Sequence, residues 1–511
     1  MDIPYYLKVG TAKDLKSPKE RRIFRTLEII PGFFSWLTLI LIVILSWLKP
    51  FWMAIFIICF VIYWLFRTIY FSFHLNACYK KMRNYEKTDW VKELNNSQLP
   101  WQKIYHLVVL PMYKEPLEIV RETFHYLLKS NYPKDKLIII LACEERGGEE
   151  VKKLVSIINS EFGDKFFKLL ITFHPAYLEG EMAGKGANET WGARKAKELI
   201  DVLSIPYENV IFSSFDVDTA IFPEYFGCLT HNYLTAENPL RSSFQPIPLF
   251  INNIWQAPPV SRIFSFSSTF WQMMCQERPE KMLTFSSHSM SFKALVDVDF
   301  RQVNVVSDDS RIFWQCFLRY NGDYHVVPMY YPVSMDANVA PTFFETMKNI
   351  YKQQRRWAYG VGDIPYFIFG FLKNKKIPLS KKLSLGGVVF EGHWSWATNS
   401  IMIFLLGWLP LFLGGEAFSQ TLLSYNLPIF TSRVLTIAML GLLGSAYLSI
   451  ILLPPKPPSY GNKKYLFFTL EWLLLPFIMI FFTAIPALEA QTRLMFGKYM
   501  GFWVTPKIRK Q

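Results

Sequence analysis

The sequence predicts an α/β domain inserted in a bundle of transmembrane α-helices. Hydrophobic residues make up 51% of the 511 residues and charged residues only 19%, an apolar excess that is typical of membrane proteins. Long uncharged runs lie near both ends of the chain, whereas the middle alternates short β-rich runs with charged stretches. A chain of this length also exceeds the usual size of one hydrophobic core.

The N-terminal part is expected to be a cytosolic segment followed by a membrane hairpin. Residues 1–28 carry many charges and lack a small-residue cleavage site, so we expect an anchor and not a removed signal peptide. The nearly uncharged runs Phe33–Leu48 and Phe51–Tyr70 are separated by Lys49-Pro50, which predicts a transmembrane hairpin over 29–75. Basic residues flank the hairpin on both sides, which places both ends in the cytosol.

Residues 90–360 are expected to form one cytosolic α/β domain. Four short apolar runs are bounded by polar or turn residues, as buried strands would be. None of them reaches the length of about 18 residues that a membrane helix needs. The four runs are Ile104–Leu110, Leu137–Ala142, Phe167–Phe173 and Asn209–Phe215.

Residues 361–490 are expected to contain interfacial and transmembrane helices. Val388–Leu413 and Ile429–Leu453 are long enough to cross the bilayer. A third apolar run, Tyr465–Leu488, is different, because a full crossing would place the basic tail 491–511 outside, against the positive-inside rule.

Glu471 and Pro476 lie within this third run and predict a broken helix. We therefore expect the run to re-enter, or to lie at the cytoplasmic interface as two short helices. Four full spans and a cytosolic tail follow from this interpretation.

Net charge and cysteine content narrow the classes of function. The net charge of +14 allows a nucleic-acid-binding protein. In a membrane protein, however, the same excess reflects Lys and Arg that face anionic lipids on the cytoplasmic side. The six cysteines are scattered without metal-ligand spacing, which favours reduced thiols in the cytosol over a disulfide framework or a zinc site.

Two acidic clusters are the first candidates for chemistry. Asp216 and Asp218 close the predicted strand Asn209–Phe215, where they would face the ligand-binding edge of an α/β sheet and offer hard oxygen ligands to a divalent cation. The alternative is an ordinary turn after a strand. Asp308 and Asp309 precede a helical stretch, so they are either a helix N-terminus or the site of a general base.

A third cluster, Gln353-Gln354-Arg355-Arg356-Trp357, lies before the apolar run Tyr366–Leu372. Two Arg beside a Trp are compatible with an anchor at the membrane surface. A guanidinium is equally suited to binding phosphate, and an indole face is a platform for a sugar ring.

Taken in order, these features resemble the family 2 glycosyltransferases, and more closely the membrane synthases of cellulose, chitin and hyaluronan. The matching features are an edge-strand motif Pro111–Glu115, the acidic strand end Glu144-Glu145, the DxD, the acidic pair and QxxRW. The resemblance extends from about residue 104 to the C-terminus.

The resemblance implies a GT-A (Rossmann-like) catalytic domain and a role for each matching position. Tyr113 and Glu115 would contact base and ribose, Glu144 replaces the family's first Asp, and Lys185 would touch the nucleotide. Asp216 and Asp218 would hold Mg²⁺ or Mn²⁺ on the diphosphate, and Asp309 would be the catalytic base. Gln353 and Arg356 would steady the diphosphate, and Trp357 would bind the acceptor sugar.

The C-terminal tail adds one further likeness. Phe502, Val504, Thr505 and Lys507 are similar to the FxVTxK gating loop of the cellulose synthases, although an isolated basic tail is the alternative. The sequence departs from the family where Ser287-His288-Ser289 stands in place of a Gly-rich acceptor-site turn, which puts the identity of the acceptor in doubt.

The resemblance implies inverting transfer from a nucleotide-diphosphate sugar, most simply a UDP-sugar, at the cytosolic face of the cell membrane. The expected acceptor is a growing polysaccharide, extended processively and exported. The alternative is addition of one sugar to a membrane lipid, giving a glycolipid. A nucleotide-binding transporter is disfavoured by the ordered carboxylates, and no nucleic-acid partner is expected.

Overall fold

The computed structural model describes residues 3–506, and its centre is a mixed sheet of eight strands. The strand order is β3-β2-β1-β4-β7-β6-β8-β5. Six strands run in one direction, and β5 and β7 are antiparallel to their neighbours. The strands are β1 (Tyr105–Met112), β2 (Leu137–Glu144), β3 (Lys168–His174), β4 (Val210–Ser214), β5 (Ala220–Ile221), β6 (Ser242–Leu249), β7 (Ser289–Ser291) and β8 (His325–Ser334).

Helices cover both faces of this sheet, which explains why the sequence of β2 is apolar throughout. All eight residues of β2 are buried. Ile138 and Ile140 belong to a core with helices α6 (Lys185–Val202) and α10 (Asp308–Arg319). Ile139 and Leu141 belong to a core with α4 (Leu117–Leu128) and α5 (Gly148–Phe162). Alternate residues of a strand point to opposite faces, so a strand covered on both faces needs apolar residues throughout. The four strands predicted from apolar runs are confirmed as β1 to β4.

One detail of the prediction is wrong. The segment Pro111–Glu115 is predicted to be an edge-strand motif, but β1 lies between β2 and β4 in the middle of the parallel part of the sheet.

The helices of the domain are α3 (Trp90–Asn96), α4 (Leu117–Leu128), α5 (Gly148–Phe162), α6 (Lys185–Val202), α7 (Tyr225–Thr235), α8 (Pro259–Gln276), α9 (Phe292–Asp297), α10 (Asp308–Arg319), α11 (Phe343–Ala358) and α12 (Asp363–Lys373).

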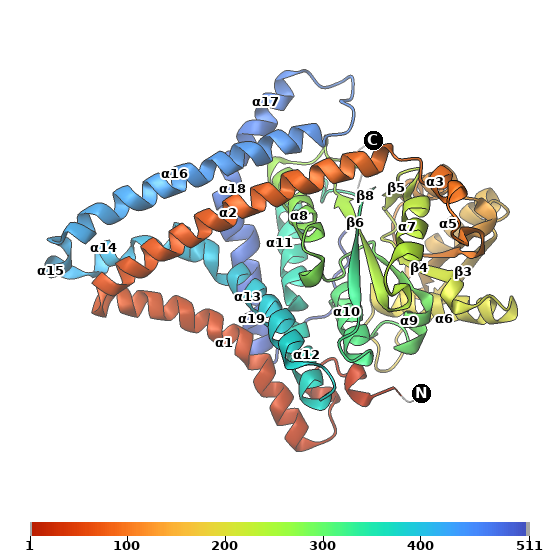
Figure 1. Ribbon diagram of the computed structural model, residues 1–511, viewed down its shortest axis with the longest axis horizontal. Coiled ribbons are helices and arrows are strands. Elements are labelled where there is room, and N and C mark those ends of the chain that lie inside the picture. The colour runs from red at the N-terminus through yellow and green to blue at the C-terminus, as the bar shows by residue number, and fades with distance from the viewer. Residues whose placement is uncertain (1–2, 507–511) are drawn as a thin grey trace.

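Long apolar helices project from one side of the α/β domain (Figure 1). Within the described residues, four helical stretches are long and apolar enough to cross a membrane: Pro18–Leu48, Pro50–Lys87, Leu422–Ile451 and Lys463–Met495. One pair of helices, Leu379–Phe404 with Leu406–Leu413, is long and apolar enough only when taken together, and it is bent by 50°. The helices of this part of the chain are α1 (Pro18–Leu48), α2 (Pro50–Lys87), α13 (Leu379–Phe404), α14 (Leu409–Leu413), α15 (Gly415–Ser419) and α16 (Leu422–Ile451). The stretch Lys463–Met495 contains α17 (Lys463–Leu470), α18 (Leu475–Met479) and α19 (Ile485–Met495).

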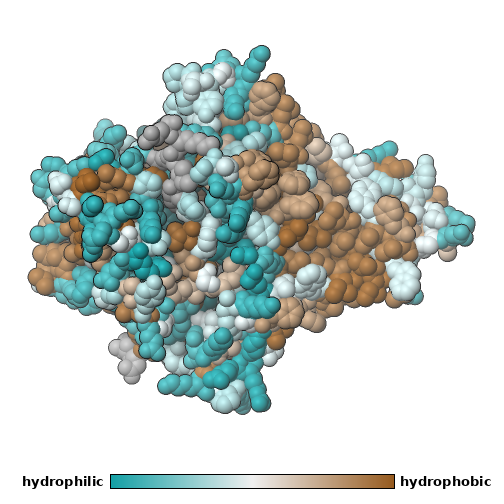
Figure 2. Space-filling view, turned by 180° about the vertical axis from the view of Figure 1, so that it is seen from behind, coloured by the Kyte–Doolittle hydropathy of each residue, from teal (hydrophilic) through white to brown (hydrophobic). Residues whose placement is uncertain are grey.

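The surface supports a membrane location. Figure 2 shows apolar surface gathered over the projecting helices, between the polar surface of the α/β domain and a paler tip. Large apolar side chains on α1, α2 and α16 are exposed, among them Trp47, Phe66 and Leu440. The predicted fold class, an α/β domain of Rossmann-like type inserted in an α-helical bundle, is confirmed. The hairpin break at Lys49-Pro50 is also confirmed, although α1 already begins at Pro18 and α2 continues to Lys87.

The stretch Lys463–Met495 has the length of a span but a different course. In Figure 1 it runs across the other apolar helices instead of along them. Glu471 accepts a hydrogen bond from Arg262 of α8 at 2.8 Å, and Glu489 accepts one from Tyr351 of α11 at 2.7 Å. Both ends of the apolar part thus contact the α/β domain. This course supports the expected interfacial position, which stays a prediction.

The break expected in this stretch has a specific form. A 3-10 turn covers Glu471–Leu474 and a π-helical turn covers Ile480–Ala484. The stretch nevertheless continues as one helical segment, and the expected pair of separate short helices is not observed. The irregular turns absorb the missing backbone donors of Pro476 and Pro486 without ending the helix.

Candidate active site

The carboxyl ends of the parallel strands meet at one edge of the sheet. β1, β2 and β4 end there at Met112, Glu144 and Ser214, and the antiparallel β7 begins there at Ser289. Segments that are far apart in sequence therefore converge at this edge, which is where open α/β sheets bind ligands.

Lys185 joins the two acidic clusters. Its Nζ lies 2.8 Å from Asp216 Oδ1 and 3.1 Å from Asp309 Oδ1. Glu189, one helical turn further along α6, lies 3.8 Å from the same Nζ. The structure thus brings together the candidate metal ligand, the candidate base and the predicted nucleotide-contacting lysine.

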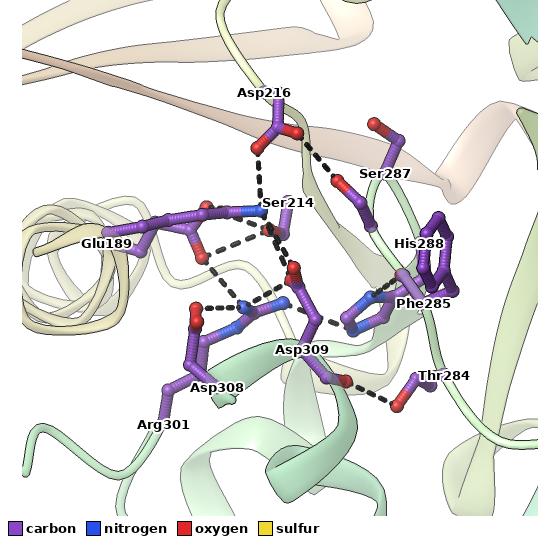
Figure 3. Close-up of polar contacts among 12 residues, drawn as sticks. Glu189, Ser214, Asp216, Thr284, Phe285, Ser287, His288, Arg301, Asp308 and Asp309 are labelled. Atoms are coloured by element: carbon purple, nitrogen blue, oxygen red, sulfur yellow. Dashed lines mark hydrogen bonds and ion pairs between the residues drawn. The ribbon is translucent and has the colours of Figure 1, made fainter. Parts of the chain in front are cut away.

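Arg301 and Glu189 complete this cluster, and sequence reasoning missed both. Arg301 Nη1 lies 2.9 Å from Asp308 Oδ2, 3.0 Å from Asp309 Oδ1 and 3.0 Å from Glu189 Oε2 (Figure 3). Ser214 Oγ donates to Glu189 Oε1 at 2.8 Å. The spacing from Lys185 to Glu189 in α6 was an available signal, but Arg301 lies in a loop without a motif.

The carboxyl groups of the cluster differ in the direction in which their pKa values are shifted. Burial raises the pKa of Glu189 to about 7, against the charges of Arg301 and Lys185. Burial and the neighbouring Asp309 charge raise the pKa of Asp308 as well. Burial also acts on Asp309, but Lys185 and Arg301 outweigh it and hold its pKa below the usual range. Asp309 is therefore ionised at neutral pH, as a general base must be.

Asp216 and Asp218 differ in their surroundings. The Asp216 side chain is 26% exposed, and its Oδ2 accepts a hydrogen bond from Ser286 at 2.7 Å. Asp218 is 1% exposed, and its Oδ2 accepts from the backbone N–H of Asp336 at 3.0 Å. No group of three metal-ligating side chains is found among residues 3–506.

These two carboxylates fit a cation that the substrate helps to hold. Mg²⁺ and similar ions commonly use one or two protein carboxylates, with phosphate oxygens and water completing the shell. Hard oxygen ligands at a strand end are the donor set for such an ion. A closed protein cage is not required.

The residues predicted to contact base and ribose form a second group at the ends of β1 and β2. Glu115 Oε2 accepts from the backbone N–H of Tyr113 at 2.7 Å. The Arg146 guanidinium lies 5.0 Å from the centre of the Tyr113 ring and pairs with Glu144. Arg146 was not predicted, and it adds a cation beside the aromatic ring.

QxxRW lies in the last turns of α11. The Arg356 guanidinium lies 4.8 Å from the Phe502 ring centre, and Gln353 Oε1 accepts from Asn338 Nδ2 at 3.3 Å. Burial lowers the pKa of Arg356, and the charges of Asp216, Asp308 and Asp309 oppose this shift. Arg356 is thus close enough to the acidic cluster to interact with its charges.

Trp357 lies in an aromatic group. Its ring centre is 5.6 Å from that of Phe264, 5.8 Å from that of Phe285 and 6.4 Å from that of Phe250. Such a group offers apolar faces on which a sugar ring can stack.

The loop Thr284–His288 connects these parts, and it contains most of the Ser-His-Ser departure noted in the sequence. Thr284 Oγ1 donates to the Asp309 carbonyl at 2.6 Å, Ser286 binds Asp216, and Phe285 packs on Trp357. Ser287 has a φ of 61°, a left-handed conformation that turns the loop sharply. One short loop therefore touches the candidate base, metal ligand and acceptor platform.

The C-terminal tail covers this region. A Cβ added at Gly184 would lie 2.6 Å from Phe502 Cγ, so glycine is needed next to Lys185 for this close approach. The Lys352 ammonium lies 5.3 Å from the Trp503 ring centre, Val504 is half-buried, and Thr505 is buried. The predicted gating residue Lys507 lies outside the described residues.

Comparisons with known proteins assign no family. No family model and no curated protein matches the chain. Among solved structures, the mannosyltransferase PcManGT from Pyrobaculum calidifontis, in complex with GDP-Man and Mn²⁺, has 13% identity and a TM-score of 0.43, over 77% of this chain and 99% of that chain. S. aureus TarS 1-349 in complex with UDP-GlcNAc has 12% identity and a TM-score of 0.31, over 66% and 90%. Likenesses this weak carry no argument, so the fold assignment rests on the sheet itself.

Proposed function

We propose that this protein transfers a sugar from a nucleotide-diphosphate sugar to an acceptor at the cytosolic face of a membrane. The observation that carries the proposal is the position of Lys185, whose Nζ contacts both Asp216 at 2.8 Å and Asp309 at 3.1 Å. Transfer from a metal-bound diphosphate needs a metal ligand and a base close to each other, and the contacts of Lys185 bring the two candidates together.

The donor half of the site consists of the residues around β1, β2 and β4. Tyr113, Glu115 and Glu144 would hold base and ribose. Asp216 and Asp218 would hold Mg²⁺ or Mn²⁺, which neutralises negative charge on the diphosphate leaving group when it is bound. Lys185, Gln353 and Arg356 would add charge and hydrogen bonds to the same phosphates. A UDP-sugar is the donor that the resemblance favours.

In the acceptor half, Asp309 would remove the proton of the acceptor hydroxyl as that oxygen attacks the sugar carbon. A single displacement of this kind inverts the configuration at that carbon. Trp357 would carry the acceptor sugar on its aromatic face. The tail with Phe502, Val504, Thr505 and Lys507 would close over bound nucleotide as a gate.

The domain assignment belongs to the same proposal. Residues 90–360 would be the cytosolic GT-A domain, 361–490 the interfacial and membrane helices, and 491–511 the cytosolic tail of a cell-membrane protein. A growing polysaccharide is the proposed acceptor, because the gate-like tail accompanies QxxRW. Transfer of one sugar to a membrane lipid is the second candidate.

The test uses purified full-length protein in lipid nanodiscs with Mg²⁺ or Mn²⁺. A panel of UDP-glucose, UDP-N-acetylglucosamine, UDP-glucuronate, UDP-galactose and GDP-mannose is assayed for nucleotide release and for labelled product. Sugar-dependent release that Asp309→Asn abolishes is expected, and product length distinguishes polymer from glycolipid. Nucleotide binding without release under any condition would refute the proposal and favour a binding or transport protein.

A further inference from the structure

Arg301 occupies the centre of the charged cluster. The residue is 2% exposed and lies in the loop between α9 and α10. Asp299 and Phe300, directly before it, have φ values of 61° and 68°, so the loop turns sharply inward at this point. A buried guanidinium needs partners for its charge, and Nη1 of Arg301 meets three carboxylates within 3.0 Å, whereas Nε has no hydrogen-bond partner among the described residues.

The other terminal nitrogen of Arg301 contacts a histidine. Nη2 lies 3.2 Å from Nε2 of His288, which is fully buried. The Nδ1 of His288 lies 2.8 Å from the carbonyl oxygen of Phe285, so Nδ1 carries the proton and Nε2 accepts from Arg301. Burial, together with the Arg301 charge, lowers the pKa of His288 to about 3. His288 is therefore a neutral link of defined orientation.

This link reaches the acceptor platform. Phe285, whose carbonyl His288 holds, packs against Trp357 with ring centres 5.8 Å apart. One guanidinium thus contacts Asp309 with one nitrogen, and with the other it contacts the residue that fixes the loop beside Trp357. In Figure 3, dashed lines run from the Arg301 guanidinium to Asp309 and to His288.

We propose that Arg301 is a positioning residue for sugar transfer, which holds the Asp309 carboxylate and, through His288, the acceptor loop in one fixed arrangement. This inference rests on the proposed function. Arg301 touches neither donor nor acceptor in this role. It sets the distance between the base and the hydroxyl that the base must deprotonate, and a misplacement of about 1 Å can cost roughly 100-fold in rate.

Lysine cannot replace arginine here. A guanidinium is a planar fork with donors at opposite edges, whereas an ammonium is a single point of charge. Arg301→Lys keeps the charge that the carboxylates need, but its one nitrogen cannot serve both the carboxylates and His288. This substitution separates geometry from charge.

The experiment compares Arg301→Lys, His288→Asn and the double variant in full-length protein in nanodiscs. Asparagine at 288 keeps a donor for the Phe285 carbonyl but lacks the Nε2 acceptor. Arg121→Lys is the matched control, because Arg121 pairs with Glu161 at 2.7 Å on α4 and α5, away from the cluster. The measured quantities are kcat, the KM of the acceptor and the Kd of UDP with Mn²⁺.

Arg301→Lys is expected to lower kcat about 100-fold, with the Kd of UDP within about threefold of wild type. His288→Asn is expected to raise the acceptor KM about 10-fold. Arg301→Lys should raise this KM equally, because it breaks the same contact with His288, and the double variant should raise it no further than either single variant. The control should match wild type.

Three results would overturn the inference. One is a kcat of Arg301→Lys within about threefold of wild type, and another is a loss of UDP binding equal to the loss of kcat, which a purely structural role predicts. The third is a double variant whose losses multiply. A wild-type protein that binds UDP but never turns over would refute the proposed function, and this inference with it.

Discussion

Asp309→Asn is the substitution that tests the proposed chemistry most directly. Asp309 Oδ1 lies 3.1 Å from Lys185 Nζ and 3.0 Å from Arg301 Nη1. The substitution removes the negative charge that these two cations contact, and it keeps the size of the side chain. A positioned general base contributes about 10²–10⁴-fold to a rate, which is about 3–5 kcal/mol of activation free energy at 1.36 kcal/mol per factor of ten. We expect kcat to fall by at least about 100-fold.

Donor binding should survive the same substitution. The cluster holds the carboxyl groups of Glu189, Asp216, Asp308 and Asp309 against the cations of Lys185, Arg301 and Arg356. Removing one negative charge makes the cluster less repulsive to a diphosphate, so the Kd of UDP with Mn²⁺ should be unchanged or smaller.

The assay pairs nucleotide release with a titration of UDP on the same preparation. Because Lys185 and Arg301 hold the pKa of Asp309 low, its carboxylate form persists through the neutral range, and the defect of the variant should be constant between about pH 6 and 8. A variant with near-wild-type turnover would show that Asp309 is not the base. A variant that loses turnover and UDP binding together would show that its role is structural.

Four further predictions follow from the same geometry. Asp216→Asn should remove most metal-dependent turnover, by about 100-fold or more, and leave the protein folded in detergent; turnover that no longer responds to Mn²⁺ concentration is the measurement. Trp357→Ala should raise the acceptor KM more than the Kd of UDP, since the stacking platform is lost, and an equal loss of both would contradict its role. Glu189→Gln should flatten the pH dependence of the unfolding temperature. In the wild type, Glu189 keeps its proton up to about pH 7 in the folded state but releases it near pH 4.5 in the unfolded chain, so stability falls as the pH rises between these values. An unchanged slope in the variant would contradict the effect of burial on this pKa. Cysteines at Ser419 and Gly501, in a background without the native cysteines, should be labelled by an impermeant thiol reagent on intact cells only at Ser419, and labelling at Gly501 would refute the cytosolic tail and the interfacial course of Lys463–Met495.

The sequence alone determined the parts of this protein that depend on local pattern. The apolar runs of β1 to β4, the hairpin break at Lys49-Pro50 and the DxD at the end of β4 were all readable, because strand burial, membrane burial and proline each leave a signature in neighbouring residues. The acidic pair at the start of α10 was readable for the same reason.

Tertiary structure decided everything that joins distant segments. Arg301 carries no motif, and it meets Glu189 because a loop and a helix come together at the edge of the sheet. The position of β1 inside the sheet, the contact of Phe502 with Gly184, and the course of Lys463–Met495 along the domain likewise depend on packing between segments far apart in the chain. The composition of that stretch makes it apolar enough to cross a membrane. Its two carboxylates, however, contact Arg262, Tyr351 and Arg355 of the domain. These contacts hold the stretch against the domain, since a carboxylate in apolar surroundings is stable only where it is paired.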